Sequence, residues 1–346
     1  SRMVSFVDFA PSVLRFTATP IPLHMQGWPV LEKNFQKKRK YVYGHRDRVD
    51  EVRDFARSVR DEKYLYIRNY MPHLGYNQPT AWPDIGEIRH EFYKLAKSGK
   101  MTPAQSHFAG PRRPIEELYD CESDPLNLSN LANSSNHQKI LKRMRNEHLR
   151  YALEIRDWGF IPEYEAWESS KNSSAWEVGK SKDVSWKKII EAADLVGRAK
   201  ETKFITNLKS QNETIRYWAT IGLGAFKKPL SNSTLSNLKI ALNDSSPSVR
   251  IEAANALIRN GKSKPALSTL KKELEHKNLI VVAHAARTVE LLGEKAKGVV
   301  LAMEACLKRA YAVRPPDLSP VIVLSGDQDM AMFVGFSCNA FLQKIK

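Results

Sequence analysis

Short alternating runs of polar and apolar residues mark the first part of the chain, which is the pattern of strands with one buried face. Residues 40–43 (KYVY) and 64–67 (YLYI) are two such runs. A further run at 57–60 (RSVR) is separated from the second by the polar residues 61–63 (DEK). This spacing predicts an antiparallel hairpin with a short polar turn.

Two later segments of this first part carry helix signals. Thr102 can cap a helix whose first residue is Pro103, and Gln105 can return the capping-box bond. Further on, residues that can share one helix face recur at three- and four-residue steps: Leu141, Met144, His148, Ala152 and Ile155. This periodicity predicts one amphipathic helix.

From residue 184 onward the pattern becomes helical and repeats. Ile215, Val249 and Val281 each stand a few residues before small alanines, at spacings in the low thirties. A polar turn at 243–247 (NDSSP) separates two of the units. Periods of this length, with small residues on the inner helix, predict a solenoid of helix pairs.

Between these parts, residues 166–183 turn rich in Ser, Lys, Asn and Gly, which predicts a linker. We therefore expect an α+β domain over 1–165 and an all-α domain over 184–346, closed by a helix at 329–346. Both domains are long enough to bury a core of their own.

Composition narrows the possible partners without fixing one. Lys and Arg total 54 against 38 Asp and Glu, a formal net charge of +16. Such a balance favours nucleic acid, an anionic membrane surface, or a sulfated or phosphorylated substrate, although a basic surface that only keeps the protein in solution fits equally well. Three cysteines without CxxC spacing predict neither a zinc site nor a disulfide framework. No apolar run reaches the length of a membrane span, and the first residues do not form a signal peptide.

The repeats resemble HEAT-like repeats. Residues 246–257 (SPSVRIEAANAL) are similar to the Pro-x-Val-Arg-x-x-Ala-x-x-Ala-Leu inner helix of that group. The preceding unit, 212–223 (NETIRYWATIGL), keeps the Ile-Arg pair without the proline, and the following one has Val282 in place of the arginine. The resemblance covers residues 184 to about 310.

The first part resembles the C-terminal region of type I, formylglycine-dependent bacterial sulfatases. Four pieces occur in the order of that family: 5–14 (SFVDFAPSVL), 20–31 (PIPLHMQGWPVL), 44–69, which begins GHRDRVD and ends YLYIRN, and 116–132 (EELYDCESDPLNLSNLA). The last piece is similar to the family's Glu-Leu-Tyr-Asp ending almost position by position.

This resemblance implies an alkaline-phosphatase-like enzyme whose C-terminal subdomain is a small antiparallel sheet with a helix. The family hydrolyses sulfate esters or sulfamates with a formylglycine made from Cys or Ser, and a calcium ion orients the sulfate. None of Cys121, Cys306 and Cys338 lies in the required Cys/Ser-x-Pro/Ala-x-Arg motif. We therefore expect the C-terminal portion of a longer sulfatase, with no catalytic residue and no metal ligand of its own, inactive alone because the nucleophile and the calcium site lie upstream.

For substrate binding, the candidates are His45, Arg46, Arg48 and His73. The first three follow a predicted strand end, and the planar fork of an arginine can bind an anion through two parallel bonds. The alternative for Arg46 is a salt bridge to Asp50 or Glu51. His73 lies on another loop that can touch substrate.

The charged residues of the predicted hairpin are interpreted differently. Arg57, Arg60, Asp61 and Arg68 alternate along it and are expected to form a solvated face.

The resemblance implies a sulfated carbohydrate as substrate and a periplasmic or secreted location. The alternative function is a helical-repeat scaffold that binds a protein or a polyanion through its concave face. Charge alone supports nucleic-acid binding, so no specific nucleic-acid partner is expected.

Overall fold

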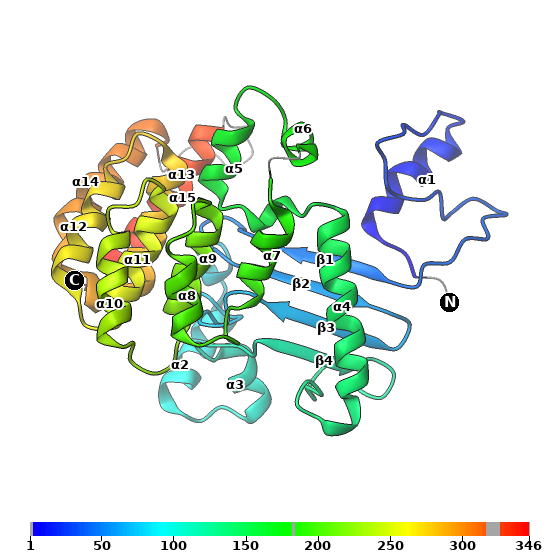
Figure 1. The fold of residues 1–346 in the computed structure, drawn as a ribbon, viewed down its shortest axis with the longest axis horizontal. Coiled ribbons are helices and arrows are strands. Elements are labelled where there is room, and N and C mark those ends of the chain that lie inside the picture. Colours follow the sequence, from blue (N-terminus) through cyan, green and yellow to red (C-terminus); the bar gives the residue numbers. More distant parts are fainter. Residues whose placement is uncertain (1–2, 182–183, 316–325, 346) are drawn as a thin grey trace. The chain divides into compact units, whose positions relative to one another are not determined.

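The computed structural model describes residues 3–181, 184–315 and 326–345 (Figure 1). The chain forms two compact units, and each is assembled from separate stretches of sequence. The first unit contains the described residues of Ser1–Arg46, Ala56–Asn69 and Glu116–Tyr151. The second contains those of Asp47–Phe55, Tyr70–Ile115 and Ala152–Lys346.

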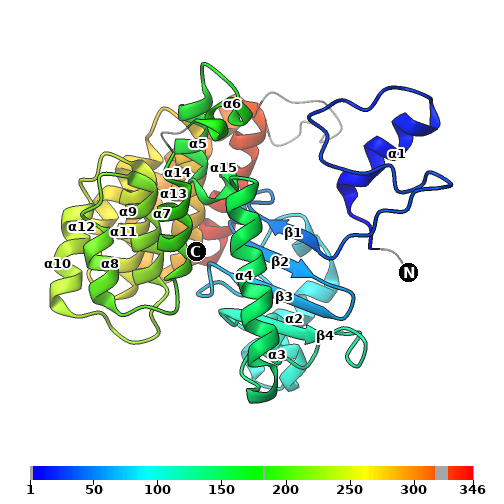
Figure 2. The ribbon, with the colours of Figure 1, turned by 45° about the vertical axis from the view of Figure 1, so that its right-hand side comes forward.

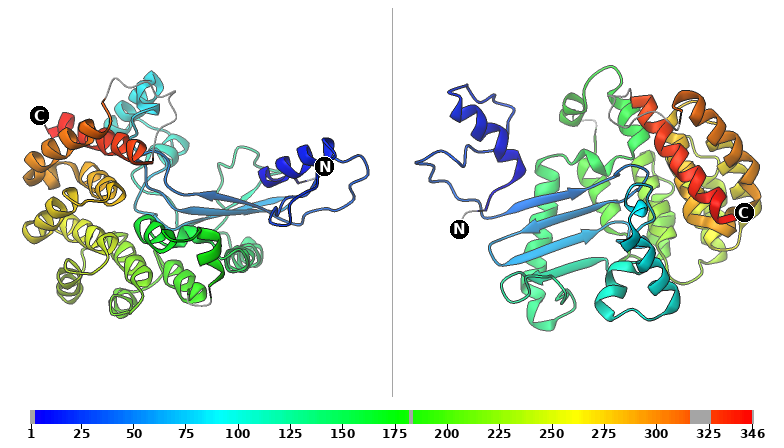
Figure 3. Two further views of the ribbon diagram at one scale, coloured as in Figure 1. Left: turned by 90° about the horizontal axis from the view of Figure 1, so that it is seen from above. Right: turned by 180° about the vertical axis from the view of Figure 1, so that it is seen from behind.

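The first unit is built around one sheet. Its helices and strands are η1 (Phe6–Asp8), α1 (Phe9–Phe16), β1 (Val42–Arg46), β2 (Ala56–Arg60), β3 (Tyr64–Asn69), β4 (Glu116–Asp120), η3 (Ser135–His137) and most of α4 (Gln138–Glu154). All neighbours in the order β1-β2-β3-β4 are antiparallel, as the right view of Figure 3 shows. The predicted hairpin is confirmed as β2 and β3, joined by a turn in which the Asp61 carboxylate accepts the backbone N–H groups of Lys63 and Tyr64.

Helix α4 covers one face of this sheet (Figure 1). Leu141 and Met144 from the helix pack on Val59, Tyr66 and Leu118 from three successive strands. These positions share a face because cross-strand partners pair Val59 with Tyr66 and Tyr66 with Leu118. The periodicity that predicted an amphipathic helix is thus confirmed, and its apolar stripe supplies this unit's core.

Two of the hairpin arginines contradict the expectation of a solvated face. Arg57 is 3% exposed and Arg68 is 0% exposed, whereas Arg60 is exposed. Both buried residues lie on the strand face that α4 covers, two positions from Val59 and Tyr66. Their guanidinium groups donate to backbone carbonyls, for example Arg68 Nη1 to the Asn69 oxygen at 2.9 Å. The strand period, and not the charge, decides which side chains are buried.

The second unit is helical. Its helices are η2 (Pro83–Ile85), α2 (Glu87–Ser98), α3 (Pro103–Ala109), η4 (Trp158–Phe160), α5 (Glu163–Ser170), α6 (Ala175–Lys180), α7 (Trp186–Asp194), α8 (Glu201–Asn207), α9 (Glu213–Gly224), α10 (Asn232–Ala241), α11 (Pro247–Arg259), α12 (Ser263–Leu274), α13 (Leu279–Leu292), η5 (Gly293–Val299), α14 (Val300–Val313) and α15 (Gly326–Ile345). The capping box at Thr102 is confirmed, and it starts α3. Helix α15 confirms the predicted closing helix, although it begins three residues earlier than expected.

From α8 onward the helices form pairs, as predicted. The inner helices α9, α11 and α13 contact one another in succession, and each contacts its outer partner, α8, α10 or α12 (Figure 2). In the left view of Figure 3 these helices follow one another along a curve, from yellow-green through yellow to orange. Ala219, Ala253 and Ala285 are fully buried at the places where the inner helices meet.

Local chemistry fixes where each inner helix begins. Asn212, Ser246 and Asn278 cap the three helices through hydrogen bonds to backbone N–H groups of the first turn. Arg216 then pairs with Asp244 at 2.7 Å, and Arg250 pairs with Glu273 at 2.6 Å. These ion pairs link each of the first two repeats to the next segment of chain. The third repeat has buried Val282 in the corresponding position, so it lacks this arginine.

The stretch expected to be a linker, 166–183, contains regular structure. The second half of α5 and all of α6 lie within it, and its last two residues lie outside the described part of the chain. Glu165 on α5, directly before this stretch, accepts hydrogen bonds from Ser246 and Ser248, the latter at 2.6 Å. Helix α5 is therefore tied to the N-terminus of α11, while the predicted domain boundaries themselves stay a prediction.

Candidate functional site

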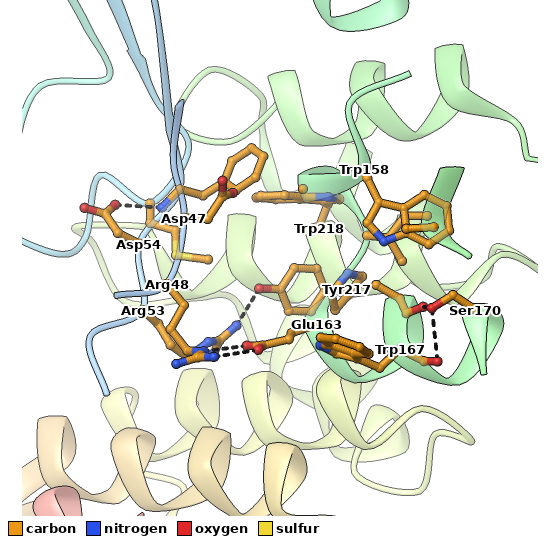
Figure 4. Close-up of a pocket in the computed structure, with 17 residues that line it drawn as sticks. Asp47, Arg48, Arg53, Asp54, Trp158, Glu163, Trp167, Ser170, Tyr217 and Trp218 are labelled. Carbon is orange, nitrogen blue, oxygen red and sulfur yellow. Dashed lines mark hydrogen bonds and ion pairs between the residues drawn. The ribbon is translucent and has the colours of Figure 1, made fainter. Parts of the chain in front are cut away.

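A pocket of about 360 Å³ lies within the second unit (Figure 4). It is enclosed by the loop Asp47–Phe55, by the segment from η4 to α6, and by α9. Five aromatic side chains and five charged ones line it: Phe55, Trp158, Trp167, Tyr217, Trp218, Asp47, Arg48, Arg53, Asp54 and Glu163. This size and this mixture are typical of small-molecule sites.

Aromatic rings make up the wall of the pocket. Trp218 is 1% exposed, and its indole N–H donates to the backbone oxygen of Phe160 at 2.8 Å. Phe55 packs edge-to-face on Trp218 with ring centroids 5.3 Å apart. Trp167, by contrast, is 60% exposed at the rim. The pocket thus combines a fixed aromatic base with an accessible indole.

An arginine and a carboxylate form a planar pair beside these rings. Arg48 binds Glu163 through two parallel hydrogen bonds of 2.7 and 2.8 Å, and its third nitrogen donates to the Asp50 backbone oxygen at 2.6 Å. Such a bidentate pair fixes both side chains in orientation. Figure 4 shows the pair beside Trp167.

Arg53 joins the pocket to a buried polar network. It donates to the Glu252 carboxylate at 2.6 Å and to the Tyr217 hydroxyl at 2.7 Å. Burial raises the pKa of Tyr217 well above its usual value. The positive charge of Arg53 opposes this rise, whereas the negative charges of Glu252 and Glu165 add to it. The phenol therefore stays neutral and cannot act as a base near neutral pH.

Each arginine that lines the pocket is paired with a carboxylate. Asp54 is bridged by Arg113, and both side chains are 1% exposed. Together with Glu252 and Arg113, the lining residues contribute three arginines and four carboxylates. A bound anion would gain little from this set, because each of the three arginines already binds a carboxylate.

The four residues predicted to bind substrate fall into two groups. His45 and Arg46 lie at the end of β1 in the first unit, and both are exposed. Arg48 and His73 belong to the second unit, where Arg48 lines the pocket. Their roles in binding stay predictions.

His73 is 6% exposed, so it does not present its ring to solvent. It lines a small cavity with Arg53 and Glu252. Burial and the nearby Arg259 lower the pKa of His73 to about 3, against the opposing effect of Glu252. The ring is therefore neutral near pH 7.

Sequence reasoning missed most of the pocket. Trp158, Glu163 and Trp167 fall within 157–167 (DWGFIPEYEAW), where the density of aromatic residues was the available signal. Tyr217 and Trp218 lie on the first inner helix, where the repeat pattern explains them as packing residues.

The residues of the pocket do not fit a calcium ion, because Asp54 and Glu163 are each bridged by an arginine instead of offering free oxygens. Across the described residues, no group of three or more His, Cys, Asp or Glu side chains is arranged to hold a metal. In the same part of the chain, no helix is long and apolar enough to cross a membrane.

The sequence of this chain matches both HEAT repeats and sulfatases among known proteins. A family model described as HEAT repeats matches residues 201–290, which contain α8 to α12 and most of α13. A protein of Formosa agariphila described as an ulvan-active sulfatase is 33% identical over 236 residues, covering 67% of this chain and 39% of the relative. A second protein of that organism with the same description is 25% identical over 151 residues, covering 42% of this chain and 28% of the relative.

The chain thus spans less than half the length of either relative. The four-stranded antiparallel sheet and the helix pairs agree with an α+β part and a HEAT-like solenoid, while the alkaline-phosphatase-like assignment stays a prediction. The chain is therefore sulfatase-related in sequence and carries helical repeats, of which residues 201–290 match HEAT repeats.

Proposed function

We propose that this chain is a portion of a sulfatase that hydrolyses sulfate esters, or sulfamates, of a sulfated carbohydrate. The observation that carries the proposal is the 33% identity to an ulvan-active sulfatase over 67% of the chain. Ulvan is therefore the first substrate to test. A polysaccharide of this kind is met outside the cytoplasm, so we place the protein in the periplasm or outside the cell.

The reaction would be the formylglycine-dependent one that the sequence resemblance implies. The formylglycine would supply the nucleophile, and calcium would offset charge on the sulfate. We assign both to the portion of the relatives that this chain does not match, since the match covers only 39% of the first relative. On its own, this chain would then be inactive.

Within this proposal, the residues of the first unit bind the anionic part of the substrate. His45 and Arg46 are exposed at a strand end, where a guanidinium can bind a sulfate or carboxylate through two bonds. Arg48 has a different role, since Glu163 already occupies its fork. His73 is neutral and buried, so it positions its loop instead of carrying charge to the substrate.

An exposed apolar surface on the first unit gives the catalytic portion a place to pack. Phe6, Phe9, Val13 and Phe16 are 86%, 49%, 58% and 69% exposed, and the last three lie along α1. Residues at such three- and four-residue steps form one helix face. An apolar face of this kind is typical of a surface that another part of the protein covers.

The test is sulfate release from ulvan in the presence of calcium, measured for this chain and for the full-length product of its gene. We expect activity only in the full-length protein. There, Arg46→Ala should raise KM at least tenfold while the exposed Arg60→Ala changes it little. Silence of the full-length protein on every sulfated polysaccharide tried would overturn the sulfatase assignment, and activity of this chain alone would overturn its dependence on a further portion.

A further inference from the structure

We propose that the aromatic pocket of the second unit binds an uncharged sugar ring of the polysaccharide. The choice of a carbohydrate as ligand rests on the proposed function. The choice of an uncharged ring rests on the pocket itself.

The pocket offers an aromatic surface that suits a sugar ring. A pyranose has apolar C–H faces, and such a face packs well against an indole ring. Trp167 is 60% exposed at the rim, and Trp158, which also lines the pocket, is half-buried. A volume of about 360 Å³ admits one or two sugar rings.

A fixed polar pair lies beside the aromatic rings of the pocket. Arg48 and Glu163 hold each other at 2.7 and 2.8 Å, so their outward hydrogen-bonding atoms have set directions. The guanidinium has N–H donors and the carboxylate has lone pairs beyond those used in the pair. Neighbouring hydroxyls of a sugar can bond to both partners at once, whereas an apolar protein side chain would leave the pair desolvated without compensation.

The charge of the pocket disfavours an anionic ligand. The lining and its direct partners hold four carboxylates against three arginines. A sulfated or carboxylated unit would bring another negative charge to this set, at a cost that a neutral ring avoids. The pocket is therefore expected to prefer the uncharged parts of the polymer.

The base of the pocket is held in place by hydrogen bonds. Trp218 and Tyr217 are held by hydrogen bonds to the Phe160 backbone and to Arg53, and both are nearly fully buried. A base that is ordered before binding lowers the entropic cost of binding.

The experiment is a titration of this chain with ulvan oligosaccharides before and after chemical desulfation, followed by tryptophan fluorescence and calorimetry. We expect the desulfated oligosaccharides to bind at least as tightly as the sulfated ones. Trp167→Ala should weaken this binding at least tenfold. Trp176→Ala is the matched control, because Trp176 is also exposed, at 52%, and does not line the pocket.

A second variant tests the charge argument. Glu163→Gln removes a carboxylate and leaves the Arg48 charge uncompensated, so preference should shift toward the sulfated oligosaccharides. The proposal is overturned if neither form of the oligosaccharide binds, if Trp167→Ala and Trp176→Ala behave alike, or if the unaltered chain binds only the sulfated form. Circular dichroism confirms that each variant is folded.

Sugar binding by the pocket and sulfatase activity can be tested independently of each other. Sulfate release from a small chromogenic sulfate ester by the full-length protein reports on the reaction without the pocket. Activity there without sugar binding overturns the pocket alone, and sugar binding without activity leaves the pocket intact while the sulfatase assignment fails.

Discussion

Glu252 is the residue on which the interior of the second unit depends. Its carboxylate accepts hydrogen bonds from Arg53 at 2.6 Å, from His284 at 2.8 Å and from Asn255 at 3.0 Å. Burial alone would raise the pKa of Glu252, but the His284 hydrogen bond and the charge of Arg53 outweigh it and hold this pKa well below its usual range. The carboxylate is therefore ionised at any pH at which the protein is used.

Replacing this carboxylate should be costly. Glu252→Gln leaves the Arg53 guanidinium buried without its counter-charge, and we expect a loss of about 3–5 kcal/mol in the free energy of unfolding. Urea denaturation measures this change in the free energy of unfolding. Glu275→Gln, at an exposed position on the same unit, is the control and should stay within about 0.5 kcal/mol of the unaltered protein. A loss below about 1 kcal/mol for Glu252→Gln would show that the network contributes little.

Two buried histidines predict a dependence of stability on pH. Burial, with the charge of Arg53, lowers the pKa of His284 to about 4, and burial with Arg259 lowers that of His73 to about 3. In the unfolded chain both rings take up protons near pH 6.5, whereas in the folded protein they stay neutral. Stability is therefore full above pH 6.5 and falls as the pH drops toward 4, by up to about 1.4 kcal/mol per pH unit for each ring.

The measurement is the free energy of unfolding at several pH values between 7 and 4.5. His284→Gln should reduce the slope by about one proton, while the exposed His24→Gln should leave it unchanged. An equal slope in all three proteins would mean that His284 is not held neutral by the fold.

At the scale of helices, the closeness of α8 and α9 depends on one glycine. A Cβ atom on Gly222 would overlap the ring of Phe204, which is fully buried on α8. Gly222→Ala should therefore destabilise the protein by about 1–3 kcal/mol through overpacking. Two residues further along α9, a Cβ on Gly224 would meet only the Ala256 methyl at 3.9 Å, so Gly224→Ala should be neutral or stabilising.

Thermal denaturation of these two variants tests the helix packing directly. Opposite or clearly different shifts of Tm are expected, although both substitutions are chemically identical. Equal shifts would argue that α8 is free to move away from α9.

At the same scale, local patterns were enough to predict most elements. Alternation gave the hairpin of β2 and β3, a capping box gave α3, and helical periodicity gave α4 and the repeats. Two kinds of feature could not be predicted from local patterns: the buried arginines of the hairpin and the pocket. Charge predicts that Arg57 and Arg68 are exposed, yet both are buried, on the strand face that α4 covers.

The pocket could not be predicted from the sequence for a different reason. Its aromatic and charged residues come from three segments that are far apart in sequence, and each has a sufficient local explanation as loop or packing residue. Their convergence is a tertiary property that no local pattern contains. Of the four substrate-binding candidates, only Arg48 lines this pocket.

At the scale of the whole molecule, the exposed apolar face of residues 6–16 should dominate behaviour in solution. We expect this chain alone to self-associate with rising concentration, because Phe9 and Phe16 present apolar rings to water. The double substitution Phe9→Ser and Phe16→Ser should shift it toward a monomer in analytical ultracentrifugation. Ile240→Ser, at an isolated exposed position on α10, should not. A monomeric unaltered chain at high concentration would refute this expectation.

The interleaving of the two units in sequence has a consequence for synthesis on the ribosome. Every strand of the sheet and the sheet-covering part of α4 are present once residue 151 has emerged, so the first unit can close early. Segments Asp47–Phe55 and Tyr70–Ile115 must wait, because Arg53 binds Glu252 on α11 and the Pro79 carbonyl binds Arg287 on α13. At ordinary translation speed, the time between the synthesis of these segments and the synthesis of their partners on α11 and α13 is roughly ten to thirty seconds. During that interval these loops are nascent chain without partners, and a chaperone has time to bind them.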